Sequence, residues 1–400
     1  MTSEPILDRV RRFVDERIIP SEPAIDRWIR ERDDPWCAIP EVEAMKAEAR
    51  SEGLWNLFLP DRTHGAGLSV RAYASVAEET GRSIFAPEVF NCNAPDTGNM
   101  EVLHLYGTEQ QKKEWLVPLL AGEIRSAFCM TEPEVASSDA TNMQATAEIR
   151  GDEIVLNGRK WWSTGVGHPH CRLLLFMGVS APDAPKHQRH SIVLVPMSTP
   201  GVRVERMLSV FGLQDPPYGH GEVVFEDVRV PVSNLIHGPG RGFEVAQGRL
   251  GPGRIHHCMR LIGAAERSLQ LLVQRATSRE AFGRPLAALG GNMDVIAECR
   301  IAIDQARLLT LQAAECIDRD GARSAMKLIS QIKVVAPRMA QKVIDHAIQI
   351  HGGAGLHHDL PLTAFFSQAR SLRLADGPDE VHLRVVAKME IEAQLGARLG

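Results

Sequence analysis

The spacing of apolar residues changes twice along this chain, and these changes limit its fold more than any other feature. Residues 1–125 carry apolar positions mainly at helical spacing, residues 126–238 alternate apolar and polar positions, and residues 239–400 return to a helical period. A helix buries one face at a period of 3.6, whereas a strand does so at a period of two. We therefore predict an α+β multidomain protein, with an N-terminal α-helical domain, a small antiparallel β domain and a C-terminal helical domain resembling a four-helix bundle.

The middle region contains the clearest strand pattern. Between Met143 and Ile149 apolar residues alternate with polar ones, and Gly151-Asp152 then suits a hairpin turn into a second strand at Ile154. Clusters of Gly, Pro and Asp separate the remaining strand candidates. These lie at residues 173–177, 191–195, 202–206 and 222–225.

Long helical stripes dominate the C-terminal region. Apolar residues follow one another at steps of three and four over residues 258–272, 295–316 and 328–346, and Gly321 stands where a helix would end. Residues 6–18 form a shorter stripe among charged residues near the N-terminus. That stripe predicts an amphipathic helix of the fold rather than a signal peptide.

Composition excludes several classes of partner. The formal net charge is −5, so the chain lacks the excess of basic residues with which proteins bind nucleic acid or anionic membranes. The longest apolar run, near residues 173–179, is too short to cross a bilayer. Seven cysteines without a CxxC pair predict small buried side chains in a reducing compartment. We expect a cytoplasmic enzyme with no nucleic-acid and no membrane partner.

Two further patterns carry no ligand site. The segment from Gly238 to Gly242 follows a loop and contains proline where a dinucleotide would need backbone N–H groups, so it is not a Rossmann motif. The histidine pairs at residues 168–170, 256–257 and 357–358 lack an HExxH motif or a Cys/His ligand set. We therefore expect no bound metal.

Several separated motifs agree with one known family in order and spacing. They are residues 107–134, which include Thr131-Glu132-Pro133, then Trp162-Ser163-Thr164, His351-Gly352-Gly353 and residues 370–382. Together they resemble the acyl-CoA dehydrogenase family, and the similarity covers nearly the whole chain. The resemblance implies FAD held between the β domain and the C-terminal bundle.

Within this resemblance, two segments of the β domain contact the flavin and the CoA thioester. Trp162 covers one flavin face and Thr164 donates near N5, since an isoalloxazine needs hydrogen-bond partners around its polar edge. Ser138 matches the family's serine because it precedes an aspartate, and Ser137 is the alternative. The implied cofactor contacts are Phe128, Met130, Thr131, Ser138, Trp162, Ser163 and Thr164, and Ser138 is also a substrate contact.

The C-terminal region supplies the remaining implied FAD contacts. Arg279, in an Arg-x-x-Phe-Gly motif, pairs with the pyrophosphate, and Phe282 lies near the adenine. In the family, this motif and the Gly352-Gly353 segment reach the FAD of a neighbouring subunit. The resemblance therefore implies a homo-oligomer, either a tetramer or a dimer. The implied contacts are Arg279, Phe282, Gln349, Ile350, His351, Gly352, Gly353, Pro378 and Glu380.

One carboxylate stands at a family base position. Asp376 falls on the glutamate of the family's Tyr-Glu-Gly-Thr motif, and the other known base position holds Gly253, which has no side chain to accept a proton. The following Gly377-Pro378 pair predicts a turn that holds the carboxylate rigidly. By resemblance, Asp376 is the catalytic residue and Gly377 contacts substrate. Arg254 is expected to open the first bundle helix and to contact substrate as well.

The resemblance implies that the enzyme dehydrogenates an acyl-CoA thioester to the 2-enoyl-CoA in fatty acid β-oxidation and passes electrons to an electron-transferring flavoprotein. Asp376 has about 1.5 Å less reach than a glutamate, the length of one covalent bond. Its Asp-Gly-Pro pattern is similar to that of a branch that processes 4-hydroxyacyl-CoA through a 4-phospho derivative. Arg370 and Arg373 are close enough in sequence to meet such a phosphate.

Two alternative functions remain open. A flavin oxidase of the nitroalkane-oxidase type shares this fold and uses an aspartate base. A non-catalytic relative of the alkylation-response type binds DNA, but the net charge of −5 and the lack of a basic C-terminal region count against it.

Overall fold

The computed structural model describes residues 4–396, which divide into two compact units. The helical unit contains residues up to 23, 48–90 and from 251 onward, and the sheet unit contains residues 24–47 and 91–250. The N-terminal residues thus contribute to both units. Within residues 4–396, no helix combines the length and the apolar character that a bilayer crossing requires.

The sheet unit is built on a seven-stranded sheet. Its strand order is β1-β4-β2-β3-β7-β6, and β5 pairs with β4. Each strand segment predicted from the sequence overlaps one of β2 to β7, although the first begins at Met143, three residues before β2, and Gly151 adopts a φ of +64° in the predicted turn. The strands are β1 (Arg125–Cys129), β2 (Thr146–Arg150), β3 (Glu153–Thr164), β4 (Cys171–Val179), β5 (His190–Pro196), β6 (Val202–Leu208) and β7 (His220–Pro231).

The predicted fold class is confirmed, but the strand pairing differs from the expectation in one respect. β1 and the start of β2 pair with β4 in parallel, whereas the other pairs of the sheet are antiparallel. Parallel neighbours need a long connection, and here the whole β2–β3 hairpin lies between β1 and β4 in the chain. β1 itself was not predicted, because it begins with a buried arginine. Arg125 donates to Oδ1 of Asn91 at 2.8 Å.

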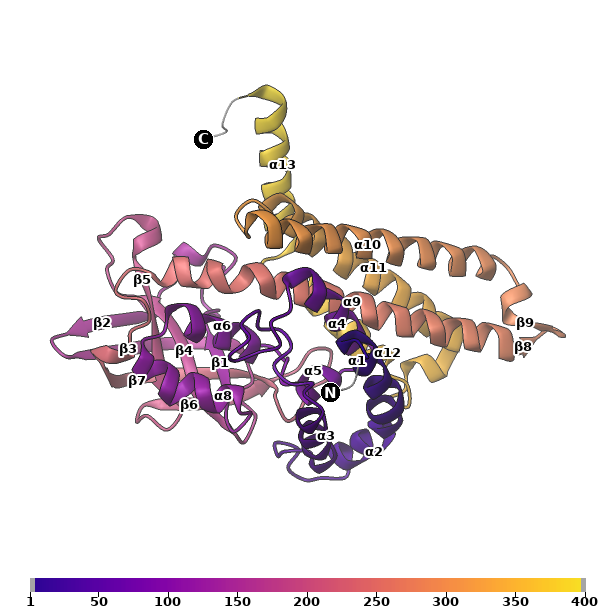
Figure 1. The fold of residues 1–400 in the computed structure, drawn as a ribbon, viewed down its shortest axis with the longest axis horizontal. Coiled ribbons are helices and arrows are strands. Elements are labelled where there is room, and N and C mark those ends of the chain that lie inside the picture. Colours follow the sequence, from indigo (N-terminus) through magenta and orange to yellow (C-terminus); the bar gives the residue numbers. More distant parts are fainter. Residues whose placement is uncertain (1–3, 397–400) are drawn as a thin grey trace. The chain divides into compact units, whose positions relative to one another are not determined.

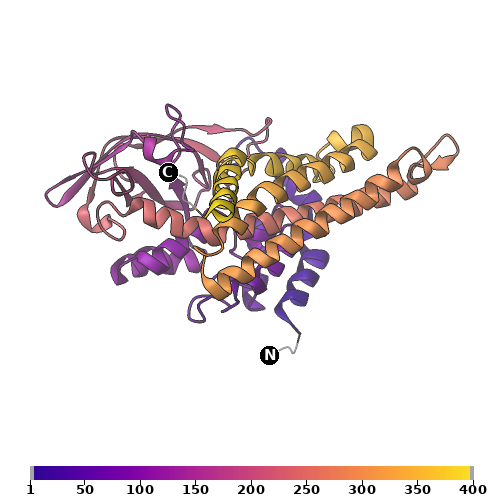
Figure 2. The ribbon, with the colours of Figure 1, turned by 90° about the horizontal axis from the view of Figure 1, so that it is seen from above.

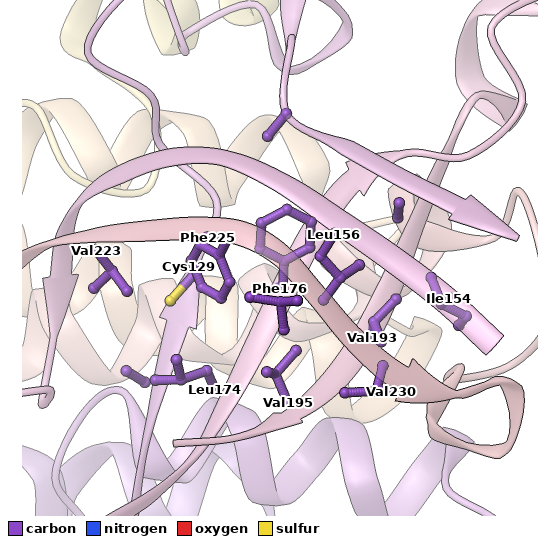
Figure 3. Close-up of a cluster of buried hydrophobic side chains, with 14 of the residues drawn as sticks. Cys129, Ile154, Leu156, Leu174, Phe176, Val193, Val195, Val223, Phe225 and Val230 are labelled. Carbon is purple, nitrogen blue, oxygen red and sulfur yellow. The ribbon is translucent and has the colours of Figure 1, made fainter. Parts of the chain in front are cut away.

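The core of the sheet unit centres on two aromatic rings (Figure 3). Phe176 of β4 and Phe225 of β7 lie with their ring centroids 4.6 Å apart, and both are almost completely buried. Leu174, Val195 and Cys129 surround them in the same cluster. Residues 174 and 176 face this cluster because side chains on one face of a strand recur every second residue.

Long helices form the helical unit, in which α9, α10 and α11 run side by side (Figures 1 and 2). α11 packs against α10, α12 and α13, and Leu272 of α9 meets Ala347 of α11 and Leu362 of α12 in a small core. The three predicted stripes lie in α9, α10 and α11, and Gly321 ends α10 with a φ of +81° as predicted. The principal helices are α1 (Ile6–Phe13), α4 (Val70–Thr80), α9 (Gly242–Ser278), α10 (Asn292–Asp320), α11 (Met326–His351), α12 (Leu362–Ser371) and α13 (Asp379–Leu395).

The remaining helices are shorter or lie near the unit boundaries. A π-helical turn (Val14–Ile18) follows α1, as part of the predicted N-terminal amphipathic helix. A second π-helical turn (Lys112–Leu116) separates α7 from α8. The other helices are α2 (Ile19–Arg30), α3 (Pro40–Ser51), α5 (Ala86–Val89), α6 (Asp96–Tyr106), α7 (Glu109–Gln111) and α8 (Val117–Leu120).

Replacing Phe176 with alanine tests the importance of the aromatic core. The ring is fully buried, so Phe176→Ala should lower the free energy of unfolding by about 3 to 5 kcal/mol through lost burial and a cavity. The measurement is a urea titration followed by far-UV circular dichroism. Ile149→Ala, at a β2 side chain that is 37% exposed, is the control and should cost under about 1 kcal/mol. Equal losses in the two variants would contradict this core.

Candidate active site

Asp376 lies in the turn between α12 and α13, in a backbone conformation that few non-glycine residues adopt. Its φ is +57°, and Gly377 follows at +99°. Aspartate tolerates this left-handed region better than most residues, and glycine adopts it freely. A Cβ atom at position 377 would lie 2.9 Å from Nε2 of His382, so the turn also needs glycine there for space. The turn predicted from Gly377-Pro378 is present.

Two buried cations hold the main chain of this turn. Nζ of Lys333 donates to the carbonyls of Leu372 and Ala375 at 2.7 and 2.8 Å. Nε of Arg254 donates to the carbonyl of Asp376 at 3.2 Å. Both side chains are buried, and burial lowers the pKa of Lys333 because it disfavours the charged form. These contacts fix the position from which the Asp376 side chain projects.

The structure corrects the prediction for the position of Arg254. α9 begins at Gly242, so Arg254 lies inside the helix and does not open it. Its Nε is bonded to the Asp376 carbonyl. Arg254 therefore supports the turn directly, and its contact with a substrate stays a prediction.

A second group of charges closes the turn around Asp379. The carboxylate of Asp379 is buried, and its Oδ2 accepts from Nε of Arg338 and Nε of Arg373, each at 3.0 Å. Arg373 also donates to Oε1 of Gln341 at 3.1 Å. The Arg373 guanidinium, expected to meet a substrate phosphate, is thus bound to protein atoms on two sides.

The Asp376 side chain is 21% exposed, so its carboxylate is partly open. Its Oδ2 lies 3.4 Å from Nε2 of His257 in α9. Arg254 and Lys333 attract the carboxylate through their positive charges. Burial lowers the pKa of His382 to about 4, so this ring is neutral at pH 7. A carboxylate held among positive and neutral groups, with one side open, can accept a proton from a ligand.

In the sheet unit, the side chain of Trp162, near the end of β3, points toward solvent. Its φ is +53° and its side chain is 40% exposed, whereas Ser163 is completely buried. The register between β3 and β7 shifts between Lys160 and Ser163, and such a bulge re-aims side chains. Beside the indole, Thr164 Oγ1 lies 2.9 Å from Nδ1 of His220. An open aromatic face next to a hydroxyl suits a flat, polar-edged ring.

A buried ion pair fixes the loop that carries Thr131-Glu132-Pro133. Nζ of Lys160 lies 2.7 Å from Oε1 of Glu132 and donates to the Met130 carbonyl at 3.0 Å. The Glu132 carboxylate also accepts the backbone N–H groups of Gln144 and Ala145. Burial lowers the pKa of Lys160 to about 8. Glu132 therefore has a structural role in this loop.

The loop contacts distinguish between the two candidate serines. Ser137 accepts the N–H of Glu132 at 2.9 Å, whereas Ser138 is exposed, which favours Ser138 as a ligand contact. Phe128, Met130 and Thr131 are partly exposed. The buried side chain of Ser163 is enclosed, so a cofactor contact at this residue passes through its backbone.

The predicted contacts of the helical region lie at its surface. Phe282 is 95% exposed with a φ of +52°, at the tip of a hairpin formed by β8 (Glu280–Ala281) and β9 (Arg284–Pro285) beyond the ends of the long helices (Figure 1). Arg279 is exposed beside it. Gly352 and Gly353 have open backbone, since a Cβ at either would meet nothing within 4 Å. Gln349 and Glu380 are exposed, and Ile350, His351 and Pro378 are partly exposed.

The sheet unit and the helical unit each contain residues that suit part of a flavin dinucleotide. Trp162 and Thr164 present an aromatic face and a hydroxyl. Nε1 of the neighbouring Trp161 is buried without a hydrogen-bond partner among the described residues. The exposed Arg279 and the open glycines suit a pyrophosphate, which binds arginine forks and close backbone.

Two lysines that shape these loops were not identified from the sequence, although both leave a signal. Lys160 continues the inward alternation of Ile154 and Leu156 in β3, so its ammonium group enters the core. Lys333 follows Ile332 on the buried side of α11. A lysine at a core position needs buried oxygen atoms nearby.

Comparison with known families covers most of the chain. Residues 2–123 match the N-terminal domain of acyl-CoA dehydrogenase, residues 127–228 match its middle domain and residues 240–390 match its C-terminal domain.

Individual relatives agree with these matches. The chain is 56% identical over 393 residues to acyl-CoA dehydrogenase family member 11 of Gallus gallus, covering 97% of this chain and 50% of that protein. It is 51% identical over 388 residues to FadE2 of Mycobacterium tuberculosis, assigned as an acyl-CoA dehydrogenase, covering 96% and 94% of the two chains. The chain spans half or less of the length of its vertebrate relatives.

A solved structure supports the same fold. A Mycobacterium abscessus protein assigned as an acyl-CoA dehydrogenase superimposes with a TM-score of 0.96 at 58% identity. The match covers 97% of this chain and 98% of that chain.

Lys160→Met tests the ion pair under the Thr131 loop. The variant leaves the Glu132 charge buried without its counter-ion, so it should lose about 3 to 5 kcal/mol of unfolding free energy. Adding Glu132→Gln removes that charge and keeps an oxygen acceptor for the backbone, so the double variant should regain more than half of the loss. Chemical denaturation gives both values. A double variant less stable than the single one would refute a charge-based role.

His382 should make the protein sensitive to acid. The pKa of its ring is about 4 when folded and 6.5 in the unfolded chain, so the unfolded state binds more protons between these values. This group's contribution is therefore present above about pH 6.5 and is lost as the pH falls to about 4, by roughly 3 kcal/mol at most. In acid the proton would add at Nδ1, which is buried without a partner among residues 4–396.

The measurement is unfolding free energy at pH 4.5 and pH 7 for the wild type and His382→Gln. The variant should lose less stability on acidification. Parallel curves for the two proteins would contradict the buried neutral ring.

Proposed function

This chain belongs to the acyl-CoA dehydrogenase family, whose members are FAD-dependent oxidoreductases, and from this premise we propose that it converts an acyl-CoA thioester to the 2-enoyl-CoA with Asp376 as the general base. The observation that carries the proposal is the fixed turn at Asp376. Its main chain is held by Lys333 and Arg254, while its side chain stays 21% exposed.

Proton abstraction follows from the chemistry of this carboxylate. The α-proton of a thioester passes to a carboxylate oxygen of Asp376 as the Cα–H bond breaks, and its electron pair stays on the substrate. A general base of this kind contributes about 10²–10⁴-fold. The fixed turn keeps the base in one place, and a displacement of 1 Å in such a site costs up to about 100-fold.

FAD, when bound, would supply the acceptor for the hydride that leaves Cβ. On the sheet unit, the residues proposed to hold it are Phe128 to Thr131, Ser138 and Trp162 to Thr164. On the helical unit they are Arg279, Phe282 and residues 349–353, with Pro378 and Glu380. The exposed indole of Trp162 and the open backbone at Gly352 support this assignment.

Exposed apolar side chains support the proposed homo-oligomer. Phe282 is 95% exposed, and along α10 the residues Met293, Ile301 and Leu308 are 70%, 57% and 69% exposed. Met293, Ile301 and Leu308 recur on one face of α10, and an apolar helix face of this kind supports a protein contact. A neighbouring copy, as a tetramer or a dimer, would cover it and would receive Arg279 and Phe282 at its own FAD. The proposed electron acceptor is an electron-transferring flavoprotein.

The proposed substrate class includes thioesters with a 4-hydroxyl or 4-phospho group. The shorter reach of Asp376 compared with a glutamate supports a substrate that differs from a simple fatty acyl chain. Arg370 is the remaining candidate for a phosphate contact, since Arg373 is bonded to Asp379 and Gln341. The aspartate base also supports an oxidase as the second candidate, and hydrogen peroxide formed at the turnover rate would favour that reading.

Asp376→Asn tests the base directly. An amide cannot take the α-proton, so anaerobic flavin bleaching by acyl-CoA should slow by at least about 100-fold while FAD stays bound. The panel consists of saturated, 4-hydroxy and 4-phospho acyl-CoA thioesters. Asp359→Asn, at an exposed carboxylate, is the control and should match the wild type. Wild-type bleaching by D376N would refute the proposal.

A further inference from the structure

His257, on α9, approaches the carboxylate of Asp376. Its Nε2 lies 3.4 Å from Oδ2, and the two side chains are 22% and 21% exposed. N–H···O hydrogen bonds usually measure about 2.7 to 3.2 Å, so a small rotation of either side chain makes this contact a hydrogen bond. The pair joins α9 to the turn before α13, where we place the base.

Three other polar side chains contact the main chain of this turn. Arg254 and His382 contact the Asp376 carbonyl oxygen at 3.2 Å each. Lys333 holds the carbonyls of Leu372 and Ala375. The main chain is thereby fixed, but the last torsion of an aspartate side chain is soft. A contact at one carboxylate oxygen restricts this torsion and so favours one direction for the other oxygen.

We infer that His257 is a positioning residue for Asp376, an inference that rests on the proposed function. The imidazole donates from Nε2 to Oδ2 and directs Oδ1 toward the α-carbon of the thioester. An aspartate has one torsion fewer and about 1.5 Å less reach than a glutamate. A short side chain reaches the substrate from fewer orientations, so a contact at Oδ2 that restricts the last torsion matters more for an aspartate than for a glutamate.

The sequence of α9 supports this role. Gly253 and His257 are four residues apart and lie on one face of the helix. A Cβ atom at position 253 would meet nothing within 4 Å, so there is space on this face one turn before His257. Gly253 places no carboxylate on this face of α9. One turn later, the same face presents the imidazole of His257 to the Asp376 side chain.

Protonation of His257 changes the charge beside the base. Imidazolium would add a positive charge to those of Arg254 and Lys333, which already attract the carboxylate. Extra positive charge stabilises the ionised carboxylate and makes it a weaker base. The titratable groups around the pair are Arg254, His256 and Cys258 of α9, Lys333 of α11 and His382 of α13.

The test compares variants of the full chain with FAD bound. His257→Gln keeps an N–H donor and loses the titration, and His257→Leu loses both. The matched control is His357→Gln, which removes a different His–Asp contact of 3.1 Å, to the exposed Asp359. Each protein is mixed anaerobically with the thioester of the panel that bleaches the wild type fastest, and the rate of flavin reduction is measured from pH 5.5 to 9.

We expect a graded loss. His257→Leu should slow flavin reduction about 100-fold at saturating thioester, with little change in thioester affinity, because the base is misdirected. His257→Gln should lose less than about 10-fold, because the donor remains, and its pH–rate profile should lack one ionisation. His357→Gln should match the wild type in rate and profile. Flavin absorbance and the thermal midpoint verify that each variant is folded and loaded.

A second readout does not depend on turnover. The imidazole NMR signal that disappears in His257→Gln belongs to His257. In Asp376→Asn its titration midpoint should move about one unit lower, because the carboxylate that stabilises imidazolium is gone. An unchanged midpoint would mean that the two side chains do not interact.

Different results would refute Asp376 as the base and His257 as its positioning residue. Wild-type reduction by Asp376→Asn would refute the proposed function. If Asp376→Asn is inactive but both His257 variants keep wild-type rates and pH profiles, Asp376 remains the base and the role of His257 is refuted.

Discussion

A buried ammonium group needs oxygen atoms around it, and this requirement shapes one loop in each unit. In the helical unit, Lys333 donates to the carbonyls of Leu372 and Ala375. In the sheet unit, Lys160 donates to the carbonyl of Met130 and pairs with Glu132. Removing a charge from water is costly unless it is paired and hydrogen-bonded. Each lysine therefore holds one loop in the shape that satisfies its ammonium group.

These two loops lead to the residues for which we propose a role in the reaction, Asp376 and Trp162. In the helical unit the held loop ends at Asp376, whose φ of +57° would be unfavourable in a mobile segment. In the sheet unit the bulge that exposes Trp162 begins beside Lys160. The left-handed backbone at Trp162 and at Asp376 lies next to buried contacts, and such contacts stabilise a conformation that is otherwise uncommon.

Much of the fold was predictable because local periodicity reflects burial. The alternation through Ile154 and the stripe over residues 295–316 predicted β3 and α10, and Gly321 predicted the end of that helix. β1 was missed because Arg125 occupies an inward position, where its partner Asn91 is 34 residues away. The parallel pairing of β1 with β4 was not predictable either, since no local pattern records which strands become neighbours.

The features of the candidate site also separate into those that local sequence predicts and those that depend on tertiary contacts. By itself, the sequence determined where the turn around Asp376 lies, and its resemblance to the family indicated the carboxylate proposed as the base and the segments proposed as flavin contacts. Only the tertiary structure decided that Arg254 supports Asp376 from 122 residues away, that Arg373 is bonded to Asp379 and that His257 faces the carboxylate. The physical reason is that periodicity and turn chemistry act over a few neighbouring residues, whereas the partner of a buried charge is set by the packing of distant helices.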